Sequence, residues 1–546
     1  MVHLVHLFKA LLVVALFGFV TVTILYAYVN SNNRIPNQIN IRRIYNIIEQ
    51  ENKTKIQNVL SKNVTNPKPQ NEIIDIVYTW VNGSDPNFLN NLKIYSVTEK
   101  KQRELAGRRF RDKNELRFSL RSIEKYASWV NHVYIVTNGQ VPYWLNTSYE
   151  KVSVITHEQI FRDVKNLPTF SSPAIESNLH RIPGISKRFI YFNDDVFLGQ
   201  PLSQEDFYTE ETGYKVFFAW PVPNCKPQCP WSKVQDGKCH AACNNMECQY
   251  DGGDCSKNHT VPAYDRTKIK TASLDGYGAS LLHSQRLLNI RYGFKDRKVA
   301  AHAPIMIDRD IMNKLEKVYE EEFKHTESNR FRAVDDIQFG FVYYSFLTNE
   351  KNNNHTMDDV FNEFDTDKSG TWTQAELTEF LIKINKSPPD TKTKEEFDSK
   401  VNQCNSTDNG SAYQDKSALS RDWINNCALL RNYIVDKMNS LPKYKFEVTK
   451  KSESLYSTME RLMSNVSKVR AQLKKLSSKM TKFVCINDDL DDAKPKENKA
   501  VEELLQNFYL SQFPQVSAFE VSEPHPPTMS PMVEDTQQKN VIVLSA

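Results

Sequence analysis

Short apolar runs and amphipathic stretches alternate along the first half of the chain. Nearly continuous apolar runs occupy residues 73–81, 132–138, 151–157 and 188–193, and residues 114–127 repeat apolar positions at helical spacing. Strands that are apolar at almost every position are buried on both faces, as in a parallel sheet covered by helices. The pattern therefore predicts an α/β fold whose core is a Rossmann-like, mixed or parallel sheet.

The pattern changes beyond this core. A cysteine-rich insert follows the fourth run, two amphipathic segments flank a polar loop, and the C-terminal third is polar with scattered helical spacing. The predicted organisation is a cytosolic tail (1–9), a transmembrane anchor (10–29), a stem (30–71), the first half of the catalytic core (72–223), the insert (224–256), the second half of the core (257–350), a helix–loop–helix (351–386), a helical region (387–485) and a mostly disordered tail with a short helix (486–546).

The N-terminal apolar segment, residues 10–29, contains no charged residue. At about 1.5 Å rise per residue its length matches a hydrocarbon layer of about 30 Å. A cleaved signal peptide is the alternative, but the run exceeds the usual core of about 7 to 15 residues and no A-x-A site follows it. We therefore expect a single-pass anchor with the catalytic body on the lumenal side of the membrane.

Composition agrees with a body in the secretory lumen. The chain has ten Asn-x-Ser/Thr sequons, and six of its nine cysteines fall within residues 225–255. The formal net charge is only +4, with basic and acidic residues interleaved, which argues against nucleic acid as a partner. A chain of 546 residues also exceeds one ordinary core, so about two or three folded units are expected.

Two adjacent carboxylates, Asp194 and Asp195, end the apolar run at residues 188–193. Ligands of an open parallel sheet collect at the carboxyl ends of its strands, and two hard oxygen donors there suit a divalent ion that bridges phosphate oxygens. An Asx turn that caps the next element is an equal alternative. We predict a catalytic Mg²⁺ or Mn²⁺ at Asp195, with Asp194 in the substrate-binding set.

Three further charged residues are candidates for substrate binding. Asp75 lies inside the run at 73–81, where an unpaired carboxylate is costly to bury, so it needs a structural arginine or a nucleotide's ribose and base. Arg117 and Arg121 are four residues apart on one face of the predicted helix, which suits a diphosphate, with a solvated face as the alternative.

A histidine and an arginine in the second half of the core are candidates for catalysis. His302 precedes Pro304 at a constrained turn between basic and acidic residues, and histidine titrates near working pH. Arg332 adds a cation for developing phosphate charge. A lone histidine is more often structural, so the neighbours of His302 carry the prediction.

The polar loop between the two amphipathic segments has the spacing of an EF-hand. Oxygen donors occupy loop positions 1, 3, 5, 7, 9 and 12, and Gly370 stands at position 6, where the loop turns sharply. Trp372 departs from the usual branched aliphatic residue at position 8. The predicted calcium ligands are Asp365, Asp367, Ser369, Thr371 and Glu376.

The cysteine-rich insert resembles a Lin12/Notch repeat, with Tyr-Asp-Gly-Gly-Asp before its last cysteine. That resemblance implies three disulfides, Cys225 with Cys248, Cys229 with Cys243 and Cys239 with Cys255, and a calcium ion near Asp236, Asn244, Asp251 and Asp254. A zinc knuckle is the competitor, which oxidation of lumenal thiols disfavours. Cys404, Cys427 and Cys485 leave one cysteine odd, so a bond between chains is a further expectation.

Four long blocks together resemble the conserved regions of the Stealth sugar-phosphate transferases. They are IVYTWVNGSDP, NELRFSLRSIEKYASWVNHVYIVTNGQVPYWLN, FSSPAIESNLHRIPGISKRFIYFNDDVF, and HAPIMIDRD with DIQFGFVYYSF. The resemblance places Asp75, Arg121, Glu176, Asp195, His302 and Arg332 in or near the active site. It implies charge stabilisation by Arg332 and Arg121, and a general base at His302 with Glu176 in reserve.

The same resemblance implies a Golgi enzyme. Its donor would be UDP-N-acetylglucosamine, and its acceptor the 6-hydroxyl of mannose on high-mannose N-glycans of lysosomal glycoproteins, with UMP released. We also expect a homodimer and an accessory subunit. The alternatives are a glycosyltransferase that moves only the sugar, and a noncatalytic lumenal module stabilised by calcium.

Overall fold

The protein is described by a computed structural model covering residues 72–96, 110–258, 261, 263–266, 275–352, 354–385, 389–407, 418–449 and 456–521. The chain divides into two units, residues 1–72 and 73–546, and nearly all described residues belong to the second. The predicted cytosolic tail, anchor and stem lie outside the described residues. No helix within the described ranges is both long enough and apolar enough to cross a membrane.

The core is a five-stranded sheet in the order β10-β4-β1-β2-β3. Its strands are β1 (Ile74–Thr79), β2 (Val133–Thr137), β3 (Val152–Thr156), β4 (Arg188–Asn193) and β10 (Ile305–Asp308). The first four run parallel and β10 runs antiparallel to β4. Ile76 and Val77 of β1 are fully buried, as expected for strands covered on both faces. The predicted α/β sheet is confirmed.

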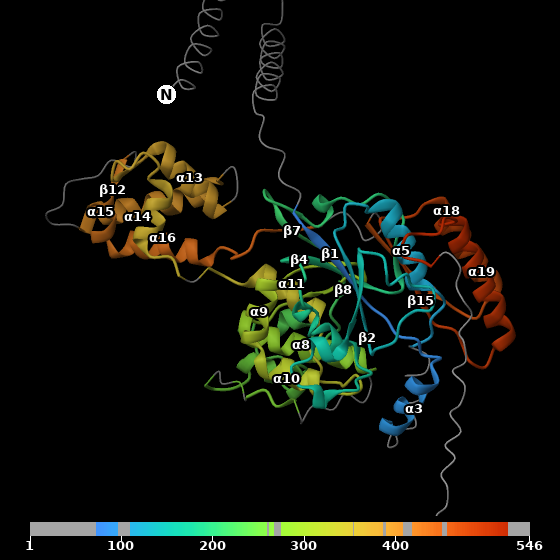
Figure 1. The fold of residues 1–546 in the computed structure, drawn as a ribbon. Coiled ribbons are helices and arrows are strands. Elements are labelled where there is room, and N and C mark those ends of the chain that lie inside the picture. The colour runs from blue at the N-terminus through green and yellow to red at the C-terminus, as the bar shows by residue number, and fades with distance from the viewer. Residues whose placement is uncertain are drawn as a thin grey trace, which may run out of the picture. The chain divides into compact units, whose positions relative to one another are not determined.

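Helices pack against this sheet, with α8 to α11 gathered on one side in Figure 1 and α5 on the other. Their bounds are α5 (Glu115–Tyr126), α8 (Gly276–Tyr292), α9 (Arg309–Val318), α10 (Glu320–Ser328) and α11 (Phe339–Asn349). Leu116, Leu120 and Ile123 of α5 belong to the main hydrophobic core. Two further helices are α3 (Pro86–Tyr95), which follows β1, and α7 (Ser172–Glu176), which precedes β4.

The C-terminal part of the chain builds a second sheet beside the core. Its strands are β5 (Val196–Leu198), β14 (Ser457–Leu462) and β15 (Phe483–Asp488), in the order β14-β15-β5. Strand β15 is antiparallel to β5, which follows β4 directly. Helices α18 (Val466–Ser478) and α19 (Pro495–Gln512) share a hydrophobic cluster with Phe197 of β5 and Ile486 of β15.

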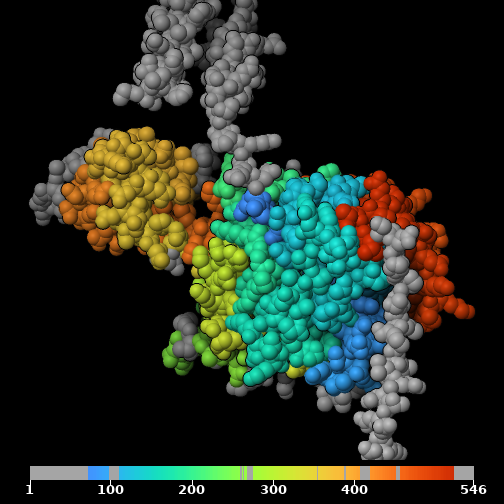
Figure 2. All heavy atoms as spheres, in the orientation of Figure 1, coloured from blue at the N-terminus to red at the C-terminus, as the bar shows by residue number. Residues whose placement is uncertain are grey.

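Two predictions about this region are therefore wrong. Strands interrupt the region predicted as helical to residue 485, and residues 486–521 are ordered where a mostly disordered tail was predicted, although α19 agrees with the short helix expected there. The stretch after residue 486 is polar in sequence, and its order depends on pairing and packing with residues about 300 positions earlier. In Figure 2 the C-terminal helices (red) lie against the cyan part of the chain, and Tyr509 stacks on Phe118.

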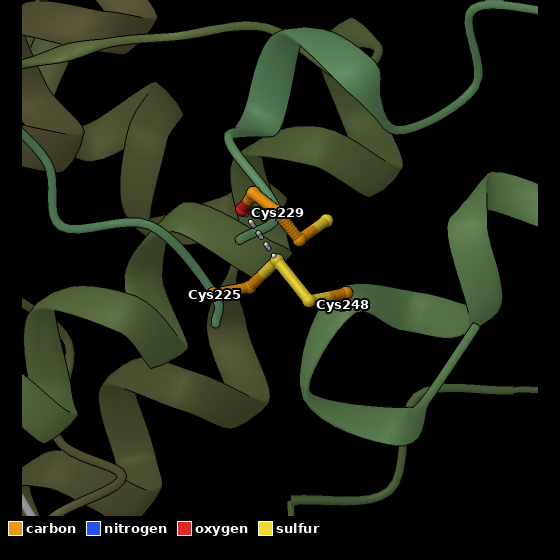
Figure 3. Close-up of side chains that lie close together, drawn as sticks. All are labelled: Cys225, Cys229 and Cys248. Carbon is orange, nitrogen blue, oxygen red and sulfur yellow. Dashed lines mark hydrogen bonds between the residues drawn. A yellow bond between two sulfur atoms is a disulfide. The ribbon is translucent and has the colours of Figure 1, made fainter. Parts of the chain in front are cut away.

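The cysteine-rich insert leaves and rejoins the core through a paired strand. Strand β8 (Phe218–Pro221) precedes the insert and pairs antiparallel with β9 (Lys298–Ala300). All three predicted disulfides form, namely Cys225–Cys248, Cys229–Cys243 and Cys239–Cys255. Figure 3 shows the first of them beside Cys229, whose backbone oxygen lies 3.3 Å from Cys225 Sγ. A zinc knuckle is excluded, since these six sulfurs are all in disulfides.

The described residues between 357 and 441 hold a separate hydrophobic cluster around a helix–loop–helix. Its elements are α12 (Met357–Phe364), β11 (Thr371–Thr373), α13 (Gln374–Asn385), α14 (Thr391–Thr407), β12 (Ala418–Ser420), α15 (Arg421–Asn426) and α16 (Ala428–Ser440). Trp372 is fully buried and stacks on Phe361, so this unusual loop residue packs inward. Cys404 and Cys427 form a fourth disulfide.

Candidate active site

The carboxyl end of β4 forms one edge of the sheet, and three segments converge there. Asn193 ends β4 opposite Thr79, the last residue of β1. Because β10 is antiparallel to β4, with Ile305 opposite Tyr191, β10 begins at the edge where β4 ends. His302, three residues before β10, is therefore brought to the end of β4, although the two segments are separated by more than 100 residues.

Asp195 meets residues from the C-terminal sheet. Its Oδ2 atom lies 3.3 Å from Cys485 Sγ and 3.4 Å from Asn487 Nδ2, both on β15, and its Oδ1 atom is buried with no hydrogen-bond partner among the described residues. Three residues each place one potential ligand atom within 4.8 Å of the other two, namely Asp195, His302 and Cys485. The structure thus joins the predicted Asp195 and His302 in one cluster.

Glu176 ends α7 and faces the same edge. Its Oε1 atom accepts a 3.1 Å hydrogen bond from Tyr191 Oη on β4, and the same phenol lies 3.1 Å from Thr79 Oγ1. Burial raises the pKa of Glu176 above its ordinary value, while Arg332, the Tyr191 hydrogen bond and His302 act to lower it. A carboxylate whose pKa is raised toward the working pH is better suited to act as a general base.

Arg332 lies on the loop between α10 and α11, next to α7. Its Nη2 atom donates a 2.5 Å hydrogen bond to Ser172 Oγ at the start of α7. Since Arg332 and His302 both affect the pKa of Glu176, the three predicted residues share one electrostatic environment. The side chain of Arg332 is only partly buried, which leaves its charge available to a ligand.

Asp194 faces a second group of acids. Burial, followed by the charges of Asp195 and Asp112, raises the pKa of Asp194 well above its ordinary range. Glu115 is also close, because burial, Asp112 and Asp194 all raise its pKa. A nearby cation or proton would relieve the repulsion among these carboxylates. Asp194 therefore adds Asp112 and Glu115 to the acidic groups near the end of β4.

Asp75 does not join this cluster. It pairs with Phe189 near the beginning of β4, so it lies at the amino edge of the sheet, opposite the candidate site. Its carboxylate accepts hydrogen bonds from the Ser186 amide at 2.8 Å and from Asn131 Nδ2 at 2.8 Å. Neither an arginine nor a nucleotide is needed to satisfy it. The geometry therefore gives Asp75 a structural role instead of the predicted substrate contact.

Arg117 and Arg121 are also engaged elsewhere. Arg121 is 6% exposed and donates to Glu520 through Nε at 2.7 Å and Nη2 at 2.8 Å, while Arg117 forms an ion pair with the same carboxylate. Arg121 Nη1 also donates to the Phe513 oxygen. The two arginines share one helix face, as predicted, but in this structure that face holds the C-terminal segment and not a diphosphate.

Sequence reasoning missed Cys485, Asn487 and Tyr191 as neighbours of the site. Cys485 and Asn487 are two residues apart on β15, so both side chains point to the same side of that strand. The apolar run FVCIN at residues 483–487 is typical of a strand, but we predicted this region as helical. Cys485 is also the one cysteine of nine left unpaired, and it is fully buried, so it does not support the predicted bond between chains.

The helix–loop–helix brings its acids together. One carboxylate oxygen each from Asp365, Asp367 and Glu376 lie within 4.8 Å of one another, and Ser369 and Thr371 belong to the same loop. Glu376 accepts hydrogen bonds from the Thr366 and Thr373 amides, each at 2.8 Å. Clustered carboxylates and carbonyl oxygens form a donor set that suits a hard divalent cation.

The insert also gathers acids. Asp251 is fully buried, its Oδ1 atom has no hydrogen-bond partner among the described residues, and burial together with Asp254 and Asp236 raises its pKa. Asp254 Oδ2 accepts a 2.9 Å hydrogen bond from the Gly237 amide. The Asn244 amide N–H donates to the backbone oxygens of His240 and Ala241. The orphaned Asp251 oxygen is the feature that best fits a cation at this point.

Comparison with known families matches five segments of the chain. The matches are Stealth protein CR1, conserved region 1 (73–96), CR2, conserved region 2 (109–216), CR3, conserved region 3 (301–349), CR4, conserved region 4 (474–529), and an LNR domain (222–256). Asp195 and Glu176 lie in the second region, His302 and Arg332 in the third, and Cys485 and Asn487 in the fourth. The cluster at the sheet edge is therefore built from three conserved regions.

Several curated proteins are similar over long stretches. The N-acetylglucosamine-1-phosphotransferase subunits alpha/beta of Homo sapiens are 53% identical over 164 residues, which is 30% of this chain but only 13% of that protein. An exopolysaccharide phosphotransferase of Lactiplantibacillus plantarum is 32% identical over 51% of this chain and 77% of its own length. A capsular polysaccharide phosphotransferase of Haemophilus influenzae is 30% identical over 55% and 71%.

Solved structures add no argument about the fold. The glycosyltransferase GlyE of Streptococcus pneumoniae TIGR4 covers 82% of this chain and 80% of its own, but with 9% identity and a TM-score of 0.23. The conserved regions and the extent of the polysaccharide phosphotransferase matches carry the assignment instead. On these grounds the chain belongs to the Stealth family of sugar-phosphate transferases.

Proposed function

We propose that the protein transfers N-acetylglucosamine 1-phosphate from UDP-N-acetylglucosamine to the 6-hydroxyl of mannose on N-glycans of glycoproteins, lysosomal ones among them, and releases UMP. The choice of donor rests on the 53% identity to the human subunits, and the reaction class rests on the family. The observation that carries the proposal is the convergence of Asp195, His302 and Cys485 within 4.8 Å. Arg332 and His302 both act on the pKa of Glu176, so these two residues and Glu176 are also close together.

In this reaction the acceptor oxygen forms a bond to the β-phosphorus of the donor. The bond from that phosphorus to the oxygen bridging the two phosphates breaks, and UMP leaves with the bridging oxygen. The proton of the hydroxyl goes to a base. We assign the base to His302, with Glu176 in reserve, because both lie at the same edge of the sheet and Glu176 has a raised pKa.

Arg332 has a separate role in the proposal. Its side chain is held by Ser172 at the start of α7, close enough to Glu176 to lower the pKa of that carboxyl. A guanidinium fixed in this way stabilises the charge that develops on the transferring phosphoryl oxygens. Because Arg117 and Arg121 are paired with Glu520, Arg332 is the arginine we assign to the diphosphate.

Asp195 fits a divalent cation, since its Oδ1 atom is buried without a hydrogen-bond partner among the described residues. A bound Mg²⁺ or Mn²⁺ would neutralise phosphate charge in the reaction. Asn487 lies 3.4 Å from the second oxygen of Asp195 and would orient that carboxylate.

We also propose two structural calcium sites, one in the helix–loop–helix as an EF-hand and one in the LNR domain. The first is supported by the cluster of Asp365, Asp367 and Glu376, and the second by the unpartnered oxygen of Asp251. Four disulfides support a secretory compartment, for which we propose the Golgi lumen with an N-terminal membrane anchor. A homodimer with an accessory subunit completes the proposal.

Site variants test the catalytic proposal against a noncatalytic module. Asp195→Asn and His302→Ala should each remove most transfer to α-methylmannoside while near-UV circular dichroism stays that of the wild type. Asp75→Asn at the opposite edge of the sheet is the control for a buried carboxylate, because it should affect stability more than turnover of the folded fraction. Equal turnover per folded molecule in the Asp195 and His302 variants would overturn the assignment.

A further inference from the structure

Cys485 is a thiol in an unusual position. Its side chain is fully buried, its sulfur lies 3.3 Å from Asp195 Oδ2, and it is the unpaired member of the nine cysteines. The phosphoryl-transfer scheme above gives this sulfur no role. With His302 and Asp195 it nevertheless places sulfur, nitrogen and oxygen donors within 4.8 Å of one another.

This donor set differs from that expected for the catalytic ion. Mg²⁺ prefers carboxylate, carbonyl and water oxygens, whereas thiolate and imidazole select Zn²⁺ and related borderline or soft ions. A cysteine, a histidine and an aspartate can all serve as zinc ligands, at about 2.3 Å for sulfur and about 2.0 to 2.2 Å for nitrogen and oxygen. The chemistry at this point therefore favours a transition metal over Mg²⁺.

The geometry also fits. Ligands at those distances around a tetrahedral ion lie about 3.5 Å apart, so atoms now within 4.8 Å need to approach by only about 1 Å. Asp195 Oδ1 is buried and makes no hydrogen bond to any described residue, so a metal would satisfy it. Binding replaces the thiol proton of Cys485, which passes to solvent, by a sulfur–metal bond.

We propose that Asp195, His302 and Cys485 form a three-residue binding site for a divalent transition metal of the Zn²⁺ class. The fourth ligand position would be taken by water. If the catalytic function proposed above holds, on which this second point rests, such an ion also occupies Asp195 and His302 and blocks transfer. Zn²⁺ then inhibits the enzyme in competition with Mg²⁺, because Zn²⁺ binds mixed nitrogen, oxygen and sulfur sites more tightly than Mn²⁺ or Mg²⁺.

Cobalt provides a test that does not depend on turnover. Co²⁺ replaces Zn²⁺ in such sites, and a cobalt–thiolate bond gives a charge-transfer absorption in the near ultraviolet. The purified folded protein, with its disulfides intact and with calcium present to fill other carboxylate sites, is titrated with Co²⁺. We expect this band to saturate at one Co²⁺ per chain. Since the other eight cysteines are in disulfides, Cys485 is the one thiol available to produce it.

Variants make the test specific. Cys485→Ser should abolish the band and weaken Co²⁺ binding at least tenfold, and Cys485→Ala repeats the test with a second replacement should serine disturb folding. His302→Ala should also weaken binding at least tenfold, whereas Glu376→Gln, in the separate carboxylate cluster of the helix–loop–helix, should leave the band unchanged. Absence of the band in the folded wild type, or its persistence in Cys485→Ser, would overturn the proposal. A band in a protein that shows no transferase activity would keep the metal site and reject the function.

Discussion

Replacing Glu520 by glutamine should loosen the C-terminal segment from the core. The side chain of Glu520 is fully buried and forms ion pairs with both Arg117 and Arg121 of α5. Its Oε1 atom also accepts a 3.0 Å hydrogen bond from the Ser517 amide. The change keeps the shape of the side chain but removes its charge. Two guanidinium groups then face a neutral amide, which has one acceptor oxygen in place of two, and Arg121 keeps its hydrogen bond to the Phe513 oxygen.

The size of the effect follows from the pKa of Glu520. Burial by itself would raise that pKa, but hydrogen bonds from Arg121, the Ser517 amide and Arg117 lower it from 4.5 to about 2. A shift of this size corresponds to about 3 kcal/mol of stability. The value agrees in order of magnitude with the loss of about 3 to 5 kcal/mol seen when one partner of a buried ion pair is removed.

The sign of the pH dependence is also determined. The folded-state pKa of Glu520 is depressed, so its contribution is fully present above about pH 4.5 and is lost as the pH falls toward about 2. Glu520→Gln should therefore be destabilised by about 3 kcal/mol at pH 7 and should lose less stability than the wild type on acidification between those values.

Urea unfolding followed by tryptophan fluorescence measures the loss, and hydrogen exchange at residues 513–521 shows where it falls. Glu503→Gln, the same change at an exposed position of α19, is the matched control and should alter stability by less than about 0.5 kcal/mol. If Glu520→Gln matched that control, the ion pairs with α5 would contribute nothing, and the reasoning about C-terminal docking would be refuted.

Three further predictions follow from the site and the helix–loop–helix. Arg332→Ala should lower kcat about 10²- to 10³-fold in steady-state kinetics, and Arg332→Lys should restore part of that loss because it keeps the positive charge. A change in KM alone would count against charge stabilisation by Arg332. Tyr191→Phe removes a hydrogen bond that lowers the pKa of Glu176 and does not touch His302. With His302 as the base, the acid limb of the pH–rate profile should therefore stay in place, and a limb that moves to higher pH would assign the base to Glu176 instead. Calcium at about 100 times the dissociation constant of the helix–loop–helix site should contribute about 2.7 kcal/mol of stability through that site in calorimetry. Glu376→Gln should lose this contribution and keep the one from the LNR domain, and an undiminished total gain would place calcium elsewhere.

The core sheet was predictable because its signal is local. The runs that form β1 to β4 are apolar at nearly every position, and each predicted strand overlaps the observed one closely. The disulfide pairing of the insert was implied by its resemblance to a Lin12/Notch repeat. The ordered C-terminal part was missed because β15 acquires its partner β5 from a segment almost 300 residues earlier, and its flanking sequence is polar.

The candidate site likewise has one part that local sequence indicates and one part that depends on contacts with remote segments. Asp195 was a candidate because the carboxyl ends of strands in an α/β sheet collect functional groups, and His302 because of its constrained turn, its charged neighbours and the family resemblance. The antiparallel direction of β10 brings the two residues to one edge of the sheet. Arg121 illustrates the limit, since its helical spacing suited a diphosphate, but Glu520, 399 residues away, is its partner. A charge pattern on one helix does not reveal what another part of the chain places against it.

The fate of the donor's β-phosphorus tests the central claim most directly. UDP-N-acetylglucosamine labelled with ³²P at the β-phosphate is incubated with the protein, α-methylmannoside and Mg²⁺ or Mn²⁺, and the products are separated. The account predicts that the label moves to the mannoside in a phosphodiester while unlabelled UMP is released. Label that remains in UDP while the sugar moves to the acceptor would contradict it, because only the sugar would then have been transferred.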